Sequence, residues 1–168
     1  MVKIAIVVED DYQVLEVWYP LLRFREEGFT VDVFGFDKEE YDSKEGYPIE
    51  ANRAFKELQA KNYDCVVIPG GYAPDRLRRY KEVVSFVREM NDRGKVVAAI
   101  CHGPWVLASA DVLRGKKATC FFSIKDDVVN AGAKYSDEEV VVDGKLVTSR
   151  KPDDLPAFCK AVIKILKP

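Results

Sequence analysis

Residues 96–104 read Val96-Val97-Ala98-Ala99-Ile100-Cys101-His102-Gly103-Pro104, a continuous apolar run that ends at a cysteine. Such a run is typical of a fully buried strand, and a helical pattern follows it, so Cys101 lies at a sharp strand-to-helix turn. In this arrangement, a nucleophile elbow, the cysteine faces the N-terminus of the next helix. Because the positive helix end favours the thiolate, the sequence predicts an unusually acidic, nucleophilic Cys101.

Strand and helix patterns alternate on both sides of this stretch. Apolar runs predict strands at residues 2–8, 29–36, 65–68 and 118–122, with a minor strand at 47–50. Helical spacing predicts helices that begin near residues 15, 55, 83, 104, 124 and 156, the fourth of them continuing to Gly115. Pro20 should kink the first helix or divide it into two segments. Asp143-Gly144 between apolar residues 140–142 and 146–148 predicts a β-hairpin.

Strands that alternate with helices predict a mostly parallel sheet covered on both faces. The chain has 168 residues without a linker, repeat or low-complexity segment, so we expect residues 1–168 to form one α/β domain. Ligands of such sheets bind outside the carboxyl ends of the strands. Three loops should meet at that edge: residues 9–12, residues 69–72 and the Cys101 turn.

Composition and charge exclude several classes of function. The net charge of −2, with basic residues scattered along the chain, gives no basis for nucleic-acid binding. No apolar run approaches the roughly 18 residues of a membrane span, and the residues after Met1 lack a signal-peptide pattern. We therefore expect a cytoplasmic protein without a membrane partner. The four cysteines share no close spacing, so we expect neither a disulfide framework nor a metal site, and no cofactor.

Cys101 and His102 are the primary candidates for catalysis. Free cysteines are usually buried and inert, an interpretation that fits Cys65 and Cys120 inside apolar strands better than Cys101 at a strand end. His102 is the sole histidine of the chain. Adjacent residues on a tight turn tend to point apart, so two mechanisms stay open. Either His102 is the base, or the helix and a neighbouring acid sustain the thiolate.

The two neighbouring loops supply the other candidates. Gly70 and Gly71 either let the chain turn or, with the N–H of His102, form an oxyanion hole. The acidic run of residues 9–11 is either a solvated loop or the source of a protonated carboxyl that donates to the thiolate. Asp75, after Pro74, is a candidate helix cap.

These residues resemble a known family. Residues 99–104 (Ala-Ile-Cys-His-Gly-Pro) and 69–76 (Pro-Gly-Gly-Tyr-Ala-Pro-Asp-Arg) are similar to those of the PfpI-type intracellular cysteine proteases. That family belongs to the superfamily of the Parkinson-associated deglycase and class I glutamine amidotransferases. The similarity continues through residues 112–115, 124–127, 130–132, 140–144 and 149–150, and so covers nearly the whole chain.

The resemblance implies a flavodoxin-like three-layer sandwich and a Cys101–His102 pair. It also implies a homo-oligomer in which an acid from the adjacent subunit completes the site, and Asp75 occupies the position of that acid. A second family glutamate contacts the nucleophile sulfur, and the alignment places Asp11 there. Both positions hold aspartate, one methylene shorter than the family glutamate, and Glu9 or Asp10 could substitute for Asp11.

The resemblance implies more than one activity, since family members are described as peptidases, as deglycases or glyoxalases acting on methylglyoxal and its adducts, and as redox-responsive stress proteins. The preferred interpretation is a cysteine hydrolase of the peptidase type, whose thiol attacks the carbonyl of a peptide. The alternative is glyoxalase or deglycase chemistry on a small carbonyl compound. A non-enzymatic redox sensor or chaperone would need Cys101 but neither His102 nor Asp75.

Overall fold

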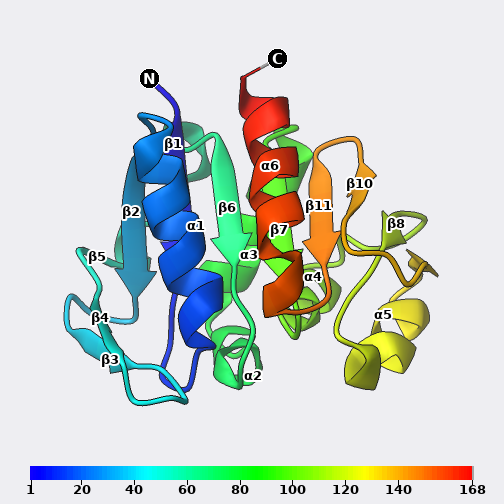
Figure 1. The fold of residues 1–168 in the computed structure, drawn as a ribbon, viewed down its shortest axis with the longest axis horizontal. Helices are drawn as coiled ribbons and strands as arrows, with labels where there is room; N and C mark the ends of the chain where they lie inside the picture. Colours follow the sequence, from blue (N-terminus) through cyan, green and yellow to red (C-terminus); the bar gives the residue numbers. More distant parts are fainter. Residues whose placement is uncertain (168) are drawn as a thin grey trace.

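A seven-stranded sheet forms the centre of the computed structural model, which describes residues 1–167 (Figure 1). Its strand order is β10-β11-β7-β6-β1-β2-β5. The strands are β1 (Lys3–Val7), β2 (Thr30–Gly35), β5 (Arg53–Ala54), β6 (Cys65–Ile68), β7 (Val96–Ile100), β10 (Val141–Asp143) and β11 (Leu146–Ser149). All neighbouring pairs are parallel except the β10–β11 hairpin, which turns at Asp143-Gly144. The predicted, mostly parallel sheet is therefore confirmed.

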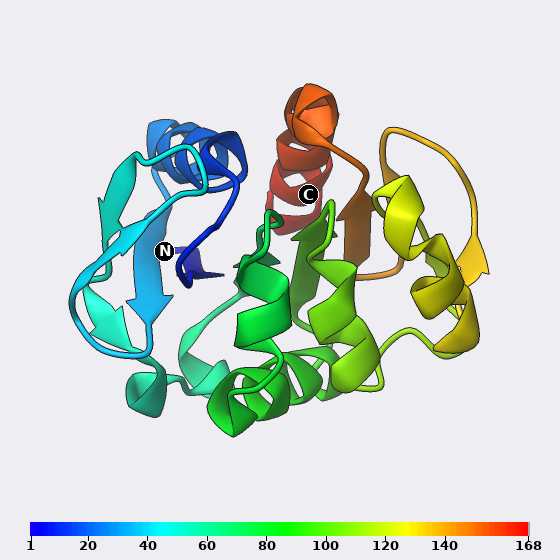
Figure 2. The same cartoon turned by 90° about the horizontal axis from the view of Figure 1, so that it is seen from below.

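Helices cover both faces of this sheet, as the view from below shows (Figure 2). One face carries α1 (Val14–Glu26) and α6 (Leu155–Leu166). The other carries α2 (Ala73–Leu77), α3 (Lys81–Asp92) and α4 (Pro104–Ser109). This arrangement is the three-layer α/β sandwich that the sequence predicts. Among residues 1–167, no helix combines the length and apolar character that a bilayer span requires.

Smaller elements flank the sheet at its two edges. Beside β2 lie the antiparallel strands β3 (Glu40–Asp42) and β4 (Pro48–Glu50), and beyond β10 lies α5 (Lys125–Asn130) with the pair β8 (Lys117–Ala118) and β9 (Lys134–Tyr135). Four 3₁₀ turns complete the described elements: η1 (Phe55–Glu57), η2 (Ala60–Asn62), η3 (Phe122–Ile124) and η4 (Pro152–Asp154).

The three central strands are apolar because both of their faces are covered. In the register of the sheet, residues 4–6 of β1 lie beside residues 65–67 of β6, which lie beside residues 96–98 of β7. All of these side chains are buried. Cys65 is one of them and fits the predicted role of a core cysteine. This rigid centre fixes where each strand ends, and with it the loops that build the site.

Two local expectations are wrong, and one of the two alternatives for Pro20 is excluded. The helix after Cys101 ends at Ser109 rather than continuing to Gly115, because Asp111 adopts a left-handed conformation (φ 57°) that turns the chain. Of the predicted strand 118–122, only Ala118 lies in a strand, β8, which pairs with β9 outside the main sheet. α1 runs through Pro20 as a single helix, so the proline does not divide it into two segments.

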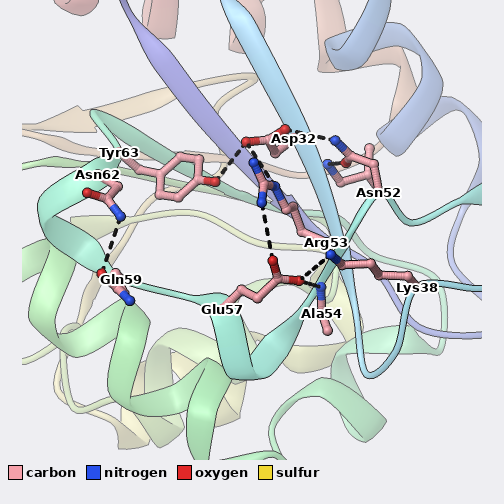
Figure 3. Close-up of polar contacts among 10 residues, drawn as sticks. Asp32, Lys38, Asn52, Arg53, Ala54, Glu57, Gln59, Asn62 and Tyr63 are labelled. Carbon is pink, nitrogen blue, oxygen red and sulfur yellow. Dashed lines mark hydrogen bonds and ion pairs between the residues drawn. The ribbon is translucent and has the colours of Figure 1, made fainter.

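Polar contacts fasten the segment between β2 and β6 to the edge of the sheet. Asp32 of β2 accepts hydrogen bonds from Asn52 Nδ2 and from the Tyr63 hydroxyl, each at 2.8 Å (Figure 3). Glu57 accepts from the Ala54 N–H at 2.8 Å, and this bond is the main cause that lowers the pKa of Glu57 to about 2. Glu57 therefore contributes to stability at neutral pH, and that contribution is lost as the pH falls from about 4.5 towards 2.

Candidate active site

Cys101 occupies the predicted elbow between β7 and α4. Its backbone has the left-handed conformation (φ 62°), which a non-glycine residue adopts only when the surroundings hold it there. The Cys101 N–H donates to the Ser149 carbonyl of β11, and the Phe121 N–H donates to the Cys101 carbonyl. The side chain is 7% exposed and lines a cavity of about 280 Å³. Residues that line this cavity are Gln13, Glu16, Lys44, Gly71, Tyr72, Cys101, His102, Phe121 and Pro152.

The carboxyl group beside the sulfur belongs to Glu16 of α1. Glu16 is fully buried, accepts a hydrogen bond from the Gly70 N–H at 2.7 Å, and interacts with the Cys101 thiol. Burial raises the pKa of Glu16 to about 7. Glu16 precedes Pro20 and Phe24 by four and eight residues on the buried face of the helix. A carboxylate on a buried helical face is the signal in the sequence that could have identified it.

The expectation that Asp11 contacts the sulfur is wrong for this structure. The Asp11 carboxylate is 42% exposed and pairs with Arg76 at 2.6 Å. The other two acids of the loop also have partners elsewhere, since Asp10 accepts from the Asp42 N–H and Glu9 from the Tyr80 hydroxyl. The loop turns at Asp11 (φ 64°) before α1 begins, and this turn brings the first turn of the helix, not the loop, to the thiol.

Burial works against the expected acidity of the thiol. Burial, followed by the charge of Glu16, raises the pKa of Cys101 to about 12, against the lowering effect of the N–H groups of Gly71 and His102. The helix that begins at Pro104 has six residues, so its end carries little charge to offset the loss of water around the sulfur. The Cys101 thiol and the Glu16 carboxyl form one buried pair, in which the ionisation of one group disfavours the ionisation of the other.

Gly70 and Gly71 have different roles in the structure. The N–H of Gly70 is occupied by Glu16, which removes it from the predicted oxyanion hole. The N–H groups of Gly71 and His102 instead face the Cys101 sulfur. A Cβ atom on Gly70 would lie 2.6 Å from the Cβ of Cys101 and 2.5 Å from a Glu16 oxygen. Glycine is needed at position 70 because the nucleophile and the acid both approach its backbone.

Gly71→Ala is expected to destabilise the protein more than Gly28→Ala. Both glycines have a positive φ (76° and 82°), so both substitutions introduce a similar strain of about 1–2 kcal/mol. At Gly71 the new Cβ would also lie 2.5 Å from the backbone nitrogen of Gln13, whereas Gly28 has nothing within 4 Å. Chemical denaturation measures the difference. Equal losses of unfolding free energy in Gly71→Ala and Gly28→Ala would contradict this, because they would show that the Gly71 turn accommodates a Cβ atom.

His102 lies within reach of the sulfur. Its Nδ1 is 3.2 Å from Cys101 Sγ, so the two neighbours do not point apart. The ring stacks on Phe121, with centroids 5.1 Å apart, and the edge of Trp105 meets it at 5.2 Å. Burial lowers the pKa of His102, which keeps the ring neutral and able to accept a proton near neutral pH. This geometry lets His102 accept a proton beside the sulfur, while Glu16 is the acid in contact with the thiol.

Ser123 is a site residue that the sequence reasoning missed. Its hydroxyl lies 3.2 Å from His102 Nε2, the nitrogen that faces away from the sulfur. Asp75, which the resemblance assigns to this role from a neighbouring subunit, is paired with Arg79, just beyond the end of α2. Within residues 1–167, Asp75 and His102 form neither a hydrogen bond nor an ion pair. No cluster of three metal-ligating side chains occurs in this part of the chain.

Comparison with known proteins gives a consistent result over the full length. Residues 2–165 match the DJ-1/PfpI family. The Pyrococcus furiosus protein named deglycase PfpI is 42% identical over 165 residues, which cover 98% of this chain and 99% of that protein. YraA of Bacillus subtilis, provisionally named a cysteine protease, is 39% identical over 166 residues, with 98% of each chain covered.

Among solved structures, a two-domain protein of Anabaena variabilis with DJ-1/ThiJ/PfpI-like and ferritin-like domains is similar to this chain with a TM-score of 0.97 and 45% identity. That match covers 99% of this chain and 48% of the two-domain protein. The similarity therefore includes every element that contributes to the candidate site.

Proposed function

Because this chain belongs to the DJ-1/PfpI family, we propose that it is a deglycase, which releases an amine from its adduct with a small carbonyl compound such as methylglyoxal. The observation that carries the proposal is the small, partly open cavity of about 280 Å³ with Cys101 and His102 in its wall. Pockets for drug-sized ligands span about 300–1,000 Å³, so this space suits a small carbonyl compound better than an extended peptide. The name of the Pyrococcus relative supports the same choice.

Activation of the thiol depends on the Cys101–Glu16 pair. The two groups are in contact, so they titrate as a pair. The pair loses its first proton near pH 7 and its second near pH 12. With the remaining proton on Glu16, the thiolate accepts from the carboxyl O–H and from the N–H groups of Gly71 and His102. With that proton on sulfur, the Glu16 carboxylate accepts from the Gly70 N–H. We propose that the pair reacts in the thiolate form, in which the Glu16 O–H and two backbone N–H groups all donate to sulfur.

Attack on the adduct uses the same groups. A bond forms between Sγ and the adduct carbon that carries the nitrogen, the C–N bond breaks, and the departing amine takes up a proton from water. Neutral His102 then removes the proton on this carbon, and negative charge moves to the neighbouring carbonyl oxygen, for which the N–H groups of Gly71 and His102 are the available donors. His102 returns the proton to the neighbouring carbon, which gives a thioester of lactate. One water molecule hydrolyses the thioester, which releases lactate and restores Cys101.

A parallel assay on two substrates tests this function. The purified protein is incubated with the methylglyoxal adduct of an amino acid and, separately, with a fluorogenic peptide, and Cys101→Ala sets the background. The proposal expects Cys101-dependent release of free amine and no peptide cleavage. Peptide cleavage that depends on Cys101, without amine release, would contradict it. That result would assign the 3.2 Å Cys101–His102 pair to the peptidase of the original interpretation.

We also propose that the active form is a homo-oligomer in which Asp75 of a neighbouring subunit acts on His102. The Asp75 side chain is 52% exposed and is held by a surface pair with Arg79, and Tyr72 beside it is also exposed. Mixing Cys101→Ala with Asp75→Ala subunits should restore about a quarter of the sites by random pairing, since a mixed interface joins one intact set of residues. Verified subunit exchange without recovered activity would contradict the shared site.

A further inference from the structure

Lys44 lies in the wall of the Cys101 cavity, and no step of the proposed mechanism uses it. Among the described residues that line this cavity, Lys44 alone has a fixed positive charge. Its side chain is 40% exposed, and its ion pair with Glu45 is long, at 3.7 Å. A cation beside a nucleophile suggests a role in recognising the substrate.

Hydrogen bonds through Tyr12 fix the position of Lys44 relative to the site. Lys44 belongs to the loop between β3 and β4, which reaches the start of α1 (Figure 1). Its N–H donates to the Tyr12 carbonyl at 2.9 Å, and the Tyr12 hydroxyl donates to the Tyr47 carbonyl at 2.7 Å. Tyr12 is fully buried and also forms a β-bridge with Gly71. The same tyrosine therefore connects the lysine to the turn that faces the sulfur.

Glu45, the ion-pair partner of Lys44, is engaged mainly elsewhere. The Glu45 carboxylate accepts from the Val14 N–H at 3.1 Å and from Gln13 Nε2 at 3.4 Å, so its main contacts are at the start of α1. Lys44 in turn acts on the groups of the site. It lowers the pKa of His102, after the larger effect of burial, and it also lowers the pKa of Glu16, against the effect of burial. The positive charge and the thiol thus share one small space.

We infer that Lys44 binds a carboxylate on the substrate, so that the preferred substrates are adducts on the α-amino group of free amino acids. In such an adduct the carboxyl carbon lies three bonds from the carbon that the thiol attacks, along the path through the nitrogen and Cα. This span fits the cavity of about 280 Å³. An adduct on a lysine side chain of a protein has no carboxylate at this distance. The inference rests on the proposed deglycase reaction for the identity of the substrate, whereas recognition of the carboxylate can be measured without turnover.

The test compares two alkylating agents of similar size at Cys101. Iodoacetate carries a carboxylate and iodoacetamide is neutral, and both form a bond from Sγ to carbon with loss of iodide. The rate ratio of iodoacetate to iodoacetamide is measured by mass spectrometry of the Cys101 peptide. Lys44→Met is expected to lower this ratio about tenfold, and added salt should lower it in the wild type, because the attraction is electrostatic. Lys44→Arg is expected to keep the wild-type ratio.

Two further variants complete the design. Lys61→Met makes the same change of net charge in η2, at the amino end of β6, and is expected to leave the ratio unchanged. Glu45→Gln removes the competing carboxylate and is expected to raise the ratio. A change of fold in Lys44→Met would alter both rates together and would not mimic a loss of selectivity.

The outcomes separate this inference from the proposed function. An equal ratio in the wild type, Lys44→Met and Lys61→Met would overturn the carboxylate site, whatever the activity of the enzyme. A ratio that depends on Lys44, in a protein that releases no amine from any adduct, would retain the anion site and reject the deglycase reaction. With an active enzyme, the alanine adduct of methylglyoxal should be turned over about tenfold faster than the alaninamide adduct.

Discussion

Cys101→Ser is expected to reduce release of amine from the methylglyoxal adduct by at least ~10³-fold in kcat. A hydroxyl in the same buried position loses its proton far less readily than a thiol, and neither Glu16 nor His102 is a strong enough base to compensate. The measurement is the initial rate of amine release at saturating adduct. Substrate saturation separates this chemical defect from weaker binding.

Cys159→Ser serves as the matched control. Cys159 is equally buried, lies in α6 and packs in the core, so its replacement should leave kcat near that of the wild type. Turnover that survives in Cys101→Ser and fails in Cys159→Ser would contradict the assignment of the nucleophile.

Glu16→Leu is expected to lower kcat/KM by about 10²-fold, the second largest effect. Leucine can neither take the thiol proton nor donate to the thiolate, and it leaves the Gly70 N–H unpaired in the core at a cost of about 1–3 kcal/mol. Glu16→Gln keeps an acceptor for Gly70 and a donor for the sulfur, so its loss of activity should be smaller. Measuring the stability of both variants separates the chemical effect from the structural one.

Glu26→Gln is the control on the same helix. Glu26 is exposed and pairs with Arg23 at the surface, so its replacement should change neither activity nor the reactivity of Cys101. Activity in Glu16→Leu equal to that in Glu26→Gln would remove Glu16 from the mechanism.

The sequence predicts the part of the site that depends on local pattern. The apolar run that ends at Cys101 determines a buried strand and its turn, and the parallel order of β1, β6 and β7 follows from alternation of strands and helices. The carboxyl ends of these strands meet at one edge, so the loops after them lie where the prediction places them. Gly71 reaches the sulfur for this reason.

The parts that the sequence could not predict depend on packing between distant segments. Glu16 reaches Cys101 because the left-handed turn at Asp11 brings in the first turn of α1 rather than the loop before it. Ser123 reaches His102 because the predicted strand 118–122 gives way to a 3₁₀ turn at Phe122–Ile124. Lys44 is placed by a single backbone bond to Tyr12, across a loop with no periodic pattern. Of these residues, only Glu16 has a signature in local spacing, as a carboxylate on the buried face of α1.

The central claim is that Cys101 becomes a thiolate because Glu16 holds the remaining proton of the pair. The most direct test is the pH dependence of Cys101 alkylation by iodoacetamide in the wild type and in Glu16→Gln. The account predicts that the wild-type rate rises with pH around a midpoint near 7, the pH at which the pair loses its first proton.

In Glu16→Gln, the amide N–H is a weaker donor to the thiolate than the carboxyl O–H, so the midpoint should move upward by about one unit. A wild-type midpoint near 12, or a midpoint that moves downward in Glu16→Gln, would instead show that Glu16 acts on the thiol only as a repelling charge. Either result would contradict the shared-proton mechanism.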